Sequence, residues 1–335
     1  MTGNLSRRDF LKLGAAAAAA SLAFTDFPPG GDPAARRPTQ EFTLGRTVYS
    51  LRYYEAPSAA SPEMGFYVTD SVVRIRDRRR GDPGKTNNPH WLRTDDGWLH
   101  SAYVQPVREQ LNIPVMKIPA NGMLAEVTVP FTQAWEITER GWKRIYRCYY
   151  GSTYWVTYAF VNNDGVVWYQ FWDDRREETY IFRAEHLRPV MPDEVAPISP
   201  GAKDKRIEID LENQRMTAYE GSRPVFATRT ATGYFEGDTP RGEFVVERKQ
   251  PTRHMASTSP GNEFDLPGVP WVCYIAWTGV SFHGTYWHNN YGTPQSHGCI
   301  NLTPEAARWV YRWTDPVVPF GEDYVEADGT RVIVF

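Results

Sequence analysis

Short runs in which apolar and polar residues alternate fill much of the chain, and this pattern predicts strands more than helices. Aromatic residues, which favour pleated strands, concentrate in these runs and make up 14% of the sequence. The clearest helical pattern begins where Thr303, Pro304 and Glu305 suit an N-cap, a first helical position and a first-turn acid. An apolar stripe continues it through Ala306, Trp309, Val310 and Trp313. The pattern therefore predicts a mainly β protein with one short helix near residue 304.

Proline-rich stretches divide this strand pattern into segments. Two segments, 45–110 and 120–190, each contain strand-like runs and close on a Pro-Val pair after a polar turn. They resemble one or two small SH3-like barrels. Residues 28–44 and 191–203 lack periodicity and hold proline and turn residues, which is typical of linkers. The remaining residues, 204–335, form the largest predicted domain.

Length, charge and cysteine content narrow the class of protein. A chain of 335 residues is long enough for two or three domains that bury their cores without disulfides. The net charge of -3 is too near balance for a nucleic-acid partner to be expected. Of the three cysteines, Cys148 and Cys273 lie in aromatic-rich apolar runs, where buried free thiols are common. A disulfide between them would need their modules to touch.

The first 27 residues have the features of an export signal. Paired arginines in Ser6–Lys12 precede a twelve-residue apolar run, Leu13–Phe24. This run is short for a membrane span, because a spanning helix needs about 20 residues. The arginine run resembles the twin-arginine export motif, which implies a protein of the cell envelope, periplasm or cell wall. Cleavage after export and retention as an uncleaved membrane anchor both stay open, since no small-x-small site stands out before Pro28.

The candidate catalytic residues lie in two motifs near the C-terminus. His283–Thr285 has the sequence His-Gly-Thr, and Ser296–Asn301 has the sequence Ser-His-Gly-Cys-Ile-Asn. A free thiol has a pKa of about 8.5, so rapid attack on an amide near neutral pH needs a base within reach. We predict Cys299 as the nucleophile and His283 as that base.

The residues beside the nucleophile suit the stabilisation of an oxyanion. Attack on a carbonyl creates a negative oxygen that needs donors already aimed at it, and Gly298 lets the backbone approach without a Cβ. The candidate donors are the N–H groups of Gly298 and Cys299 and the ring of His297. Because Cys299 precedes the predicted helix, the helix dipole lowers its pKa only modestly.

Several residues admit more than one interpretation. His297 either takes part in catalysis or only holds the loop. Trp287 and His288 lie between the two motifs, where substrate contact and surface packing are both open. A zinc ion would occupy the nucleophile and the spacing matches no common site, so we predict neither metal nor cofactor. The arginine-rich run Arg74–Arg80 could attract an anionic cell-wall polymer, although a solvated loop accounts for it as well.

Residues 206–335 resemble the L,D-transpeptidase catalytic domain of the YkuD type, whose signature is a His-Gly-Thr-like segment followed at this spacing by Ser-His-Gly-Cys. The runs 207–211 and 216–219, separated by a turn, are similar to the family's opening hairpin. Residues 239–244, Thr-Pro-Arg-Gly-Glu-Phe, are similar to a family turn that leads into a strand. The resemblance implies a β-sandwich with one short helix after Cys299.

The resemblance also implies roles for the motif residues. Cys299 becomes the nucleophile and His283 its base, with the second ring nitrogen held by the main-chain carbonyl of Gly284. Many members have arginine where this chain has Asn301, which is expected to fix the loop or touch substrate. The candidate substrate contacts are Thr285, Trp287, His288, Ser296 and Asn301.

The implied reaction is a two-step acyl transfer on peptidoglycan stem peptides. The thiol attacks the amide between a third-position diamino acid and a terminal D-Ala, forms a thioester and releases D-Ala. An amine of a neighbouring stem then completes a 3-3 cross-link, whereas water would make the enzyme an L,D-carboxypeptidase and an amine of an envelope protein would make it a protein anchorer. Two other classes stay open: an envelope-binding scaffold with an inactive catalytic domain, and a papain-type cysteine peptidase, whose local signature differs. Cell-wall polymers are candidate partners of the N-terminal modules, and an uncleaved signal would be the expected membrane contact.

Overall fold

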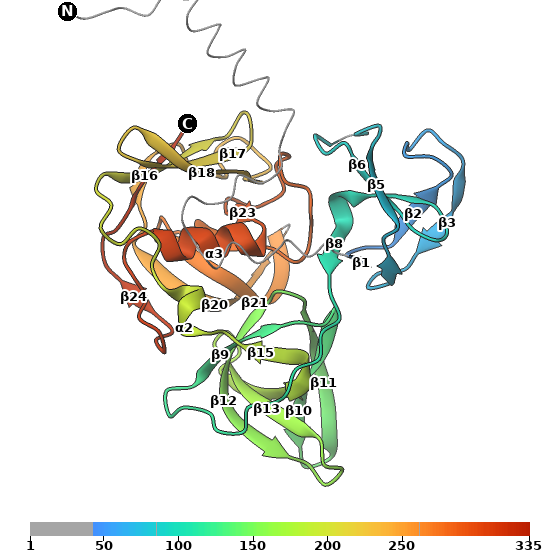
Figure 1. Ribbon diagram of the computed structural model, residues 1–335, viewed down its shortest axis with the longest axis vertical. Helices are drawn as coiled ribbons and strands as arrows, with labels where there is room; N and C mark the ends of the chain where they lie inside the picture. The colour runs from blue at the N-terminus through green and yellow to red at the C-terminus, as the bar shows by residue number, and fades with distance from the viewer. Residues whose placement is uncertain (1–42, 85, 261) are drawn as a thin grey trace, which may run out of the picture.

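The computed structural model describes residues 43–84, 86–260 and 262–335. The predicted signal segment and nearly all of the predicted linker 28–44 lie outside this range. The described part contains no helix that is long and apolar enough to cross a membrane. Its strands form five sheets, which we group into module 1 (residues 43–107), module 2 (residues 123–190) and the C-terminal module (residues 205–335). Figure 1 shows the C-terminal module at the upper left, module 1 at the upper right and module 2 below them.

Module 1 consists of two small antiparallel sheets, with strand orders β4-β1-β8 and β3-β2-β7-β6-β5. A small hydrophobic core joins them and contains Val73, Leu92, Leu99 and Val104. Its likeness to an SH3 barrel stays a prediction. The strands are β1 (Leu44–Thr47), β2 (Leu51–Tyr54), β3 (Glu63–Tyr67), β4 (Val72–Arg74), β5 (Asp77–Arg80), β6 (His90–Arg93), β7 (Trp98–His100) and β8 (Val104–Val107), with a 3-10 turn at Ser101–Tyr103.

The arginine-rich run of module 1 is partly neutralised by ion pairs. The Arg76 guanidinium lies 2.7 Å from Asp95, and that of Arg79 lies 2.8 Å from Asp77. Both pairs are largely exposed, so each contributes little to stability. The pairing nevertheless reduces the positive charge that an anionic polymer would meet.

Module 2 is one strongly curved seven-stranded antiparallel sheet with the order β11-β10-β14-β13-β12-β9-β15. Aromatic rings fill its core, where Phe171 stacks on Phe182 with ring centroids 4.5 Å apart. Such rings bury large apolar areas, which explains why so short a segment keeps its own core. The strands are β9 (Met123–Val127), β10 (Phe131–Thr138), β11 (Gly141–Tyr149), β12 (Thr153–Val161), β13 (Val167–Asp173), β14 (Glu178–Arg183) and β15 (Leu187–Pro189), with a 3-10 turn at Ala184–His186.

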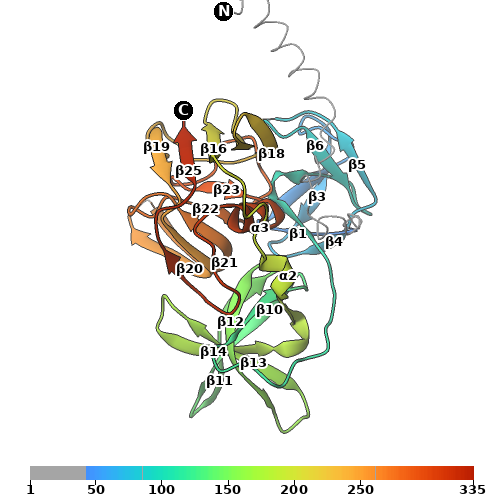
Figure 2. The same ribbon diagram turned by 60° about the vertical axis from the view of Figure 1, so that its left-hand side comes forward.

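The C-terminal module has two five-stranded sheets, ordered β18-β17-β16-β25-β19 and β23-β22-β21-β20-β24. One hydrophobic cluster joins both sheets to the helix α3 (Pro304–Trp313), which lies between them in Figures 1 and 2. The predicted mainly β fold with a helix after Cys299 is confirmed. The strands are β16 (Lys205–Asp210), β17 (Arg215–Glu220), β18 (Arg223–Arg229), β19 (Gly242–Val245), β20 (Arg248–Ser259), β21 (Asn262–Tyr274), β22 (Ser281–Gly284), β23 (Ile300–Leu302), β24 (Val325–Glu326) and β25 (Arg331–Val334).

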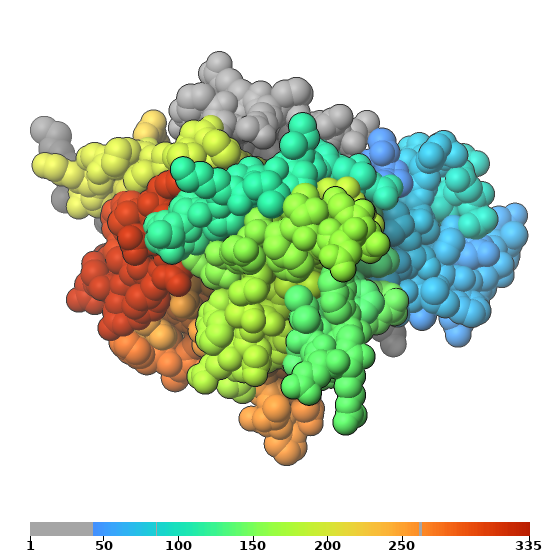
Figure 3. Space-filling model, turned by 90° about the horizontal axis from the view of Figure 1, so that it is seen from below, coloured from blue at the N-terminus to red at the C-terminus, as the bar shows by residue number. Residues whose placement is uncertain are grey.

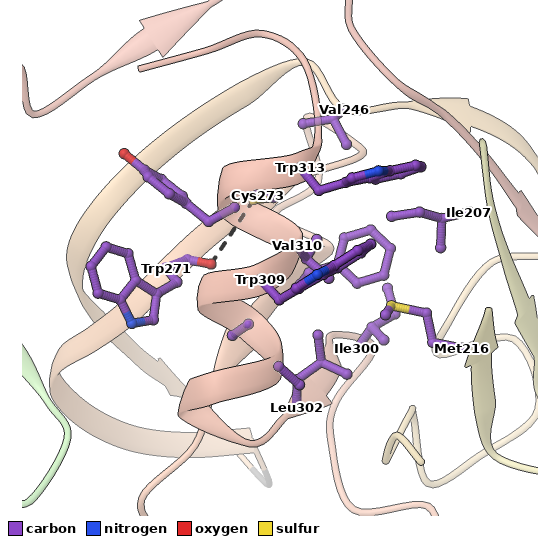
Figure 4. Close-up of a cluster of buried hydrophobic side chains, with 14 of the residues drawn as sticks. Ile207, Met216, Val246, Trp271, Cys273, Ile300, Leu302, Trp309, Val310 and Trp313 are labelled. Atoms are coloured by element: carbon purple, nitrogen blue, oxygen red, sulfur yellow. Dashed lines mark hydrogen bonds between the residues drawn. The ribbon is translucent and has the colours of Figure 1, made fainter. Parts of the chain in front are cut away.

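Helix α3 begins as its sequence predicts and is fixed at both ends. The Thr303 hydroxyl accepts a hydrogen bond from the N–H of Ala306, and Pro304 occupies the first turn. Figure 4 shows Trp309 and Trp313 side by side on one face, with ring centroids 5.2 Å apart. At the other end, the buried Lys249 ammonium donates to three main-chain carbonyls in and just after the last turn. A cation at a helix C-terminus is stabilising, so the helix that follows the nucleophile is firmly anchored.

The thiols of Cys148 and Cys273 are free and fully buried in separate cores. Burial raises the pKa of Cys148 to about 12 and that of Cys273 to about 11. Cys148 and Cys273 are therefore buried free thiols, as the sequence suggested, and no disulfide joins them.

Module 1 contacts the loop that joins the two catalytic motifs. Arg46, which is 2% exposed, lies 2.5 Å from Asp70 and donates to the carbonyl of Tyr286 at 2.6 Å. The Asn87 amide donates to the carbonyl of Gly292 at 2.8 Å. Because both carbonyls belong to the loop between the motifs, module 1 helps to shape the region beside the predicted active site.

The segment predicted as a linker, 191–203, begins with the short helix α2 (Pro192–Val195). Glu194 is 5% exposed and pairs with Arg188 at 2.7 Å and with Arg308 of α3 at 3.1 Å. These ion pairs outweigh burial and lower the pKa of Glu194 to about 2. The connection between module 2 and the C-terminal module is therefore pinned to both.

The long hairpin of β20 and β21 binds module 2 through a buried histidine. His254 is 4% exposed, its Nδ1 lies 2.9 Å from both carboxylate oxygens of Asp173 in module 2, and its Nε2 contacts Asp265 across the hairpin. Tyr146 also donates to Asp173, and Arg176 pairs with Asp265. Burial alone would lower the pKa of His254, but the hydrogen bonds and charges of the two carboxylates outweigh it and raise that pKa.

This arrangement predicts that the contact weakens as pH rises. A histidine with a raised pKa stabilises the fold fully below its ordinary pKa of about 6.5, and the contribution is lost as pH increases through the folded value. We expect the difference in melting temperature between the native protein and His254→Gln to be largest near pH 6 and to shrink toward pH 9. A difference that stays constant across this range would contradict the charged state assigned to His254.

Candidate active site

The two predicted motifs occupy neighbouring parallel strands. In β22 and β23, His283 pairs with Asn301 and Phe282 with Ile300, and continuing this register by one more residue places Cys299, which directly precedes β23, opposite Ser281. Side chains two residues apart on a strand share a face, so the imidazole and the thiol lie on the same side of the sheet. Diagonal neighbours on one face of a sheet lie within about 7 to 8 Å of each other, so the imidazole and the thiol share one region of the surface. The hydrophobic core lies on the other side, beneath Phe282 and Ile300.

His283 is held as a neutral imidazole. Its Nδ1–H donates to the carbonyl of Gly284 at 3.2 Å, which fixes the tautomer and leaves the lone pair on Nε2. Burial lowers its pKa to about 4, although the bond to Gly284 opposes this. Trp287 covers the ring, with centroids 5.6 Å apart. The ring is therefore unprotonated at neutral pH, with its lone pair on Nε2.

The glycine at position 284 is required by packing as well as by the motif. A Cβ there would lie 2.8 Å from Pro270 and 3.0 Å from Pro304. Any larger residue would push apart the strand that carries the base and the helix that follows the nucleophile.

Cys299 is half-buried, so its side chain is neither sealed in the core nor fully exposed. The sulfur lies 3.7 Å from the hydroxyl of Ser281 and 3.7 Å from the carbonyl of Gly279. Burial raises the pKa of the thiol, and the contacts with Ser281 only partly offset this. At neutral pH the thiol and the imidazole are therefore both uncharged.

The backbone around the nucleophile is held by two hydroxyl groups. Ser296 donates to the carbonyl of Cys299 at 2.6 Å and accepts from the N–H of Gly298 at 3.1 Å. Thr239 donates to the carbonyl of Gly298 at 2.8 Å and accepts from the N–H of Gly233 at 2.9 Å. Gly298 has φ of +130°, and a Cβ there would lie 2.6 Å from the carbonyl oxygen of Asp238. The glycine is thus needed for packing, and of the candidate oxyanion donors the N–H of Cys299 and the ring of His297 remain.

Two family models match parts of the chain. The model of the YkuD family, described as the L,D-transpeptidase catalytic domain, matches residues 204–334. Residues 204–334 form an L,D-transpeptidase catalytic domain. A second model, the twin-arginine translocation signal sequence, matches residues 4–24, so the chain is exported to the cell envelope.

Individual relatives cover only part of the chain. The L,D-transpeptidase domain is similar to a putative L,D-transpeptidase YkuD of Bacillus licheniformis, with 31% identity over 104 residues, or 31% of this chain and 56% of that protein. The chain therefore spans just over half the length of this curated relative. Among solved structures, an L,D-transpeptidase from Mycobacterium smegmatis aligns at 21% identity with a TM-score of 0.33, covering 50% of this chain and 90% of that one. The catalytic domain of an E. faecium L,D-transpeptidase aligns at 29% identity with a TM-score of 0.32, covering 40% and 99%.

Three of the predicted substrate contacts lie inside the L,D-transpeptidase domain. Thr285, His288 and Asn301 are each at most 3% exposed. Nδ1 of His288 accepts from the N–H of Asn290, and Nε2 lies 2.9 Å from the amide nitrogen of Asn301. Within the described residues, the buried amide oxygen of Asn301 has no hydrogen-bond partner. In this structure they hold the loop and present little surface to a substrate.

His297 points outward from the catalytic loop. It is exposed, and its ring stacks on Phe264 of the long hairpin, with centroids 5.9 Å apart, and lies near Tyr234 at 6.3 Å. This position links the L,D-transpeptidase loop to the hairpin, and it leaves both of the roles considered for His297 open to experiment. A cavity of about 290 Å³ beside this loop is lined by residues that include Thr239, Phe235 and Arg241.

Thr239 is a positioning residue that the sequence marked only as part of a family-like turn. It is 3% exposed, and valine in its place keeps the shape but leaves a buried N–H and a buried carbonyl without partners. We expect Thr239→Val to lower kcat roughly tenfold to a hundredfold, because small displacements of reacting groups have effects of that size. Thr239→Ser keeps the hydroxyl and should restore most of the rate. Equal losses in both variants would contradict a role for the hydroxyl.

Proposed function

We propose that the protein is an L,D-transpeptidase of peptidoglycan stem peptides that works through a cysteine thioester. The observation that carries this proposal is the placement of His283 and Cys299 on one face of adjacent strands, with the Nδ1–H of the histidine held by Gly284 and Nε2 left as the base. The half-buried sulfur and the twin-arginine signal are consistent with a substrate outside the cytoplasm.

In the first step, the thiol proton moves to Nε2 of His283 while the sulfur attacks the carbonyl carbon before the terminal D-Ala. The N–H of Cys299 is the nearest candidate to stabilise the oxyanion. The C–N bond then breaks, the nitrogen takes the proton back from the imidazolium, and D-Ala leaves. The acyl group remains on Cys299 as a thioester.

In the second step, an amine of a neighbouring stem attacks the thioester carbonyl. His283 accepts a proton from that amine and returns it to the sulfur as the C–S bond breaks. The product is an amide between two third-position residues, a 3-3 cross-link. The neutral resting pair suits both steps, because each passes one proton through the same nitrogen.

The test is incubation of the purified protein with a defined tetrapeptide stem that ends in D-Ala, followed by mass spectrometry. We expect release of D-Ala, a mass on the protein that corresponds to the acyl group, and dimers when an acceptor stem is present. Tripeptide alone would indicate an L,D-carboxypeptidase, and cleavage of ordinary L,L-peptides would indicate a papain-type peptidase.

A second probe, a carbapenem, distinguishes an active enzyme from an envelope-binding scaffold with an inactive catalytic domain. The family resemblance implies that a carbapenem acylates Cys299. The thiol attacks the strained lactam carbonyl, the ring opens, and the acyl group stays on the sulfur as a thioester. An adduct that disappears in Cys299→Ala, together with turnover of the stem, supports the enzyme. A freely titratable thiol that gives neither adduct nor turnover would indicate the scaffold.

A further inference from the structure

Module 2 contains a cavity of about 500 Å³ that takes no part in the proposed reaction. Its walls come from β10, β11, β13, β14 and the turn between β12 and β13, and its volume lies in the range of small-ligand sites. Figure 3 shows module 2 in front of the other two modules, with module 1 on one side and the C-terminal module on the other. The cavity is lined by residues that include Trp135, Trp142, Trp168, Asn162, Asp164 and Arg183.

The tryptophans belong to the face of the sheet that is turned away from the core of module 2. Trp135 follows Ala134, and Trp168 precedes Tyr169, both of which lie in that core. Successive side chains of a strand point to opposite faces, so these two rings point outward. An outward sheet face is usually polar, which makes a cluster of indoles there a sign of binding.

The indoles form a connected aromatic wall. Trp142 packs edge-on against Trp168 with centroids 4.6 Å apart and lies 6.5 Å from Trp135. Trp142 is 40% exposed, so part of this wall is open to solvent. On the neighbouring strand Phe160 pairs with Trp168 and stacks on Tyr158, which is 56% exposed. The aromatic surface therefore continues beyond the cavity along β12.

Polar groups of both signs complete the cavity. Asp164 contributes a negative charge and Asn162 an amide, and the positive charge of Arg183 is already paired with Glu185 at 2.7 Å. Within the described part of the chain, the buried indole N–H of Trp168 has no hydrogen-bond acceptor, although more than nine-tenths of its side chain is buried. A buried donor without an acceptor is costly, and a ligand that supplies an oxygen removes that cost.

These features select a neutral ligand with flat apolar faces and a hydroxylated edge. The C–H faces of a pyranose ring stack on indoles, while its hydroxyl and acetamido groups both donate and accept hydrogen bonds. A phosphate-rich polymer would need an excess of cations, which this cavity lacks because Asp164 lines it and Glu185 pairs with Arg183. We propose that module 2 binds the glycan strand of peptidoglycan in this cavity. The proposal rests on the proposed function for the identity of the polymer, but the site itself is separate from Cys299.

The test uses the exported form of the full chain and peptidoglycan glycan strands from which an amidase has removed the stems. The lactyl carboxylates that this leaves are converted to amides, so that the stripped glycan is uncharged like the lactyl amides of the native strand. Binding is followed by calorimetry and by tryptophan fluorescence. We expect saturable binding that Trp142→Ala and Asp164→Ala each weaken about threefold to tenfold, the size expected for one aromatic or hydrogen-bonding contact. Trp277→Ala is the matched control, because this indole is 68% exposed in the C-terminal module and should leave glycan affinity unchanged.

Turnover of a free tetrapeptide stem separates the two proposals. The cavity variants should keep native turnover of this glycan-free substrate, and Cys299→Ala should keep native glycan affinity. Absence of binding to stripped glycan, or equal binding by the native protein and both cavity variants, would overturn the glycan site even if turnover is normal. Saturable binding that depends on Trp142 and Asp164 supports the site even if no stem is turned over.

Discussion

Cys299→Ser is expected to abolish turnover of stem peptides, with a loss of at least about a thousandfold in kcat/KM. A serine hydroxyl is far less acidic than a thiol, and a base whose pKa is about 4 cannot remove its proton. The oxygen would also lie in a site shaped for a larger sulfur, which contacts Ser281 and Gly279 at 3.7 Å. The measurement is D-Ala release from a defined tetrapeptide stem.

The control for this variant removes a different sulfur. Cys148 lies in the core of module 2, so Cys148→Ala should keep most of the turnover if the protein still melts cooperatively. Cys299→Ser should melt close to the native temperature, because its side chain is only half-buried. Turnover retained by Cys299→Ser would show that another group is the nucleophile.

His283→Ala is expected to lower kcat/KM by roughly two to four orders of magnitude, the usual contribution of a general base. The pH dependence of kcat/KM for the native protein should also report the protonation of this histidine. Because only the unprotonated ring accepts the thiol proton, kcat/KM should fall as pH decreases through about 4, the pKa of the buried ring, and should not fall between pH 5 and 7 on its account. The pH profile of the native enzyme and the rate of the variant are the two measurements.

Two other histidines serve as controls for His283→Ala. His90 is exposed in module 1, so His90→Ala should leave the rate unchanged. His297 is exposed beside the nucleophile, and His297→Ala distinguishes its two roles, since a second catalytic role predicts a loss in kcat and a structural role does not. A near-native rate for His283→Ala together with a large loss for His297→Ala would move the base to His297.

The sequence was sufficient for the parts of the site that depend on local pattern. The helix after Cys299 could be predicted because its cap and first turn are coded in consecutive residues. The hairpin of β16 and β17 was expected at the correct place. The assignment of Cys299 as nucleophile and His283 as base, which rests on their motifs, stays a prediction. Each of these inferences needs only residues that are close along the chain or that share one motif.

The contacts that shape the loop depend on distant residues and could not be predicted in the same way. Thr239 contacts Gly298 across 59 positions, and Ser281 reaches Cys299 across a parallel strand pair. The register of that pair also turns Asn301 toward His288 instead of toward solvent. A motif identifies which residues are present, but the direction of each side chain follows from strand pairing that forms only in the folded chain.

The burial of Cys148 and Cys273 determines which thiol of the protein can react with oxidants outside the cytoplasm. Both are fully buried with raised pKa values, so neither offers a thiolate to peroxide or to a passing disulfide. Of the three sulfurs only that of Cys299 belongs to a half-buried residue. In the proposed enzyme, oxidation of the Cys299 sulfur to a sulfenic acid will therefore stop turnover until a reductant reverses it, and no disulfides will form between the modules.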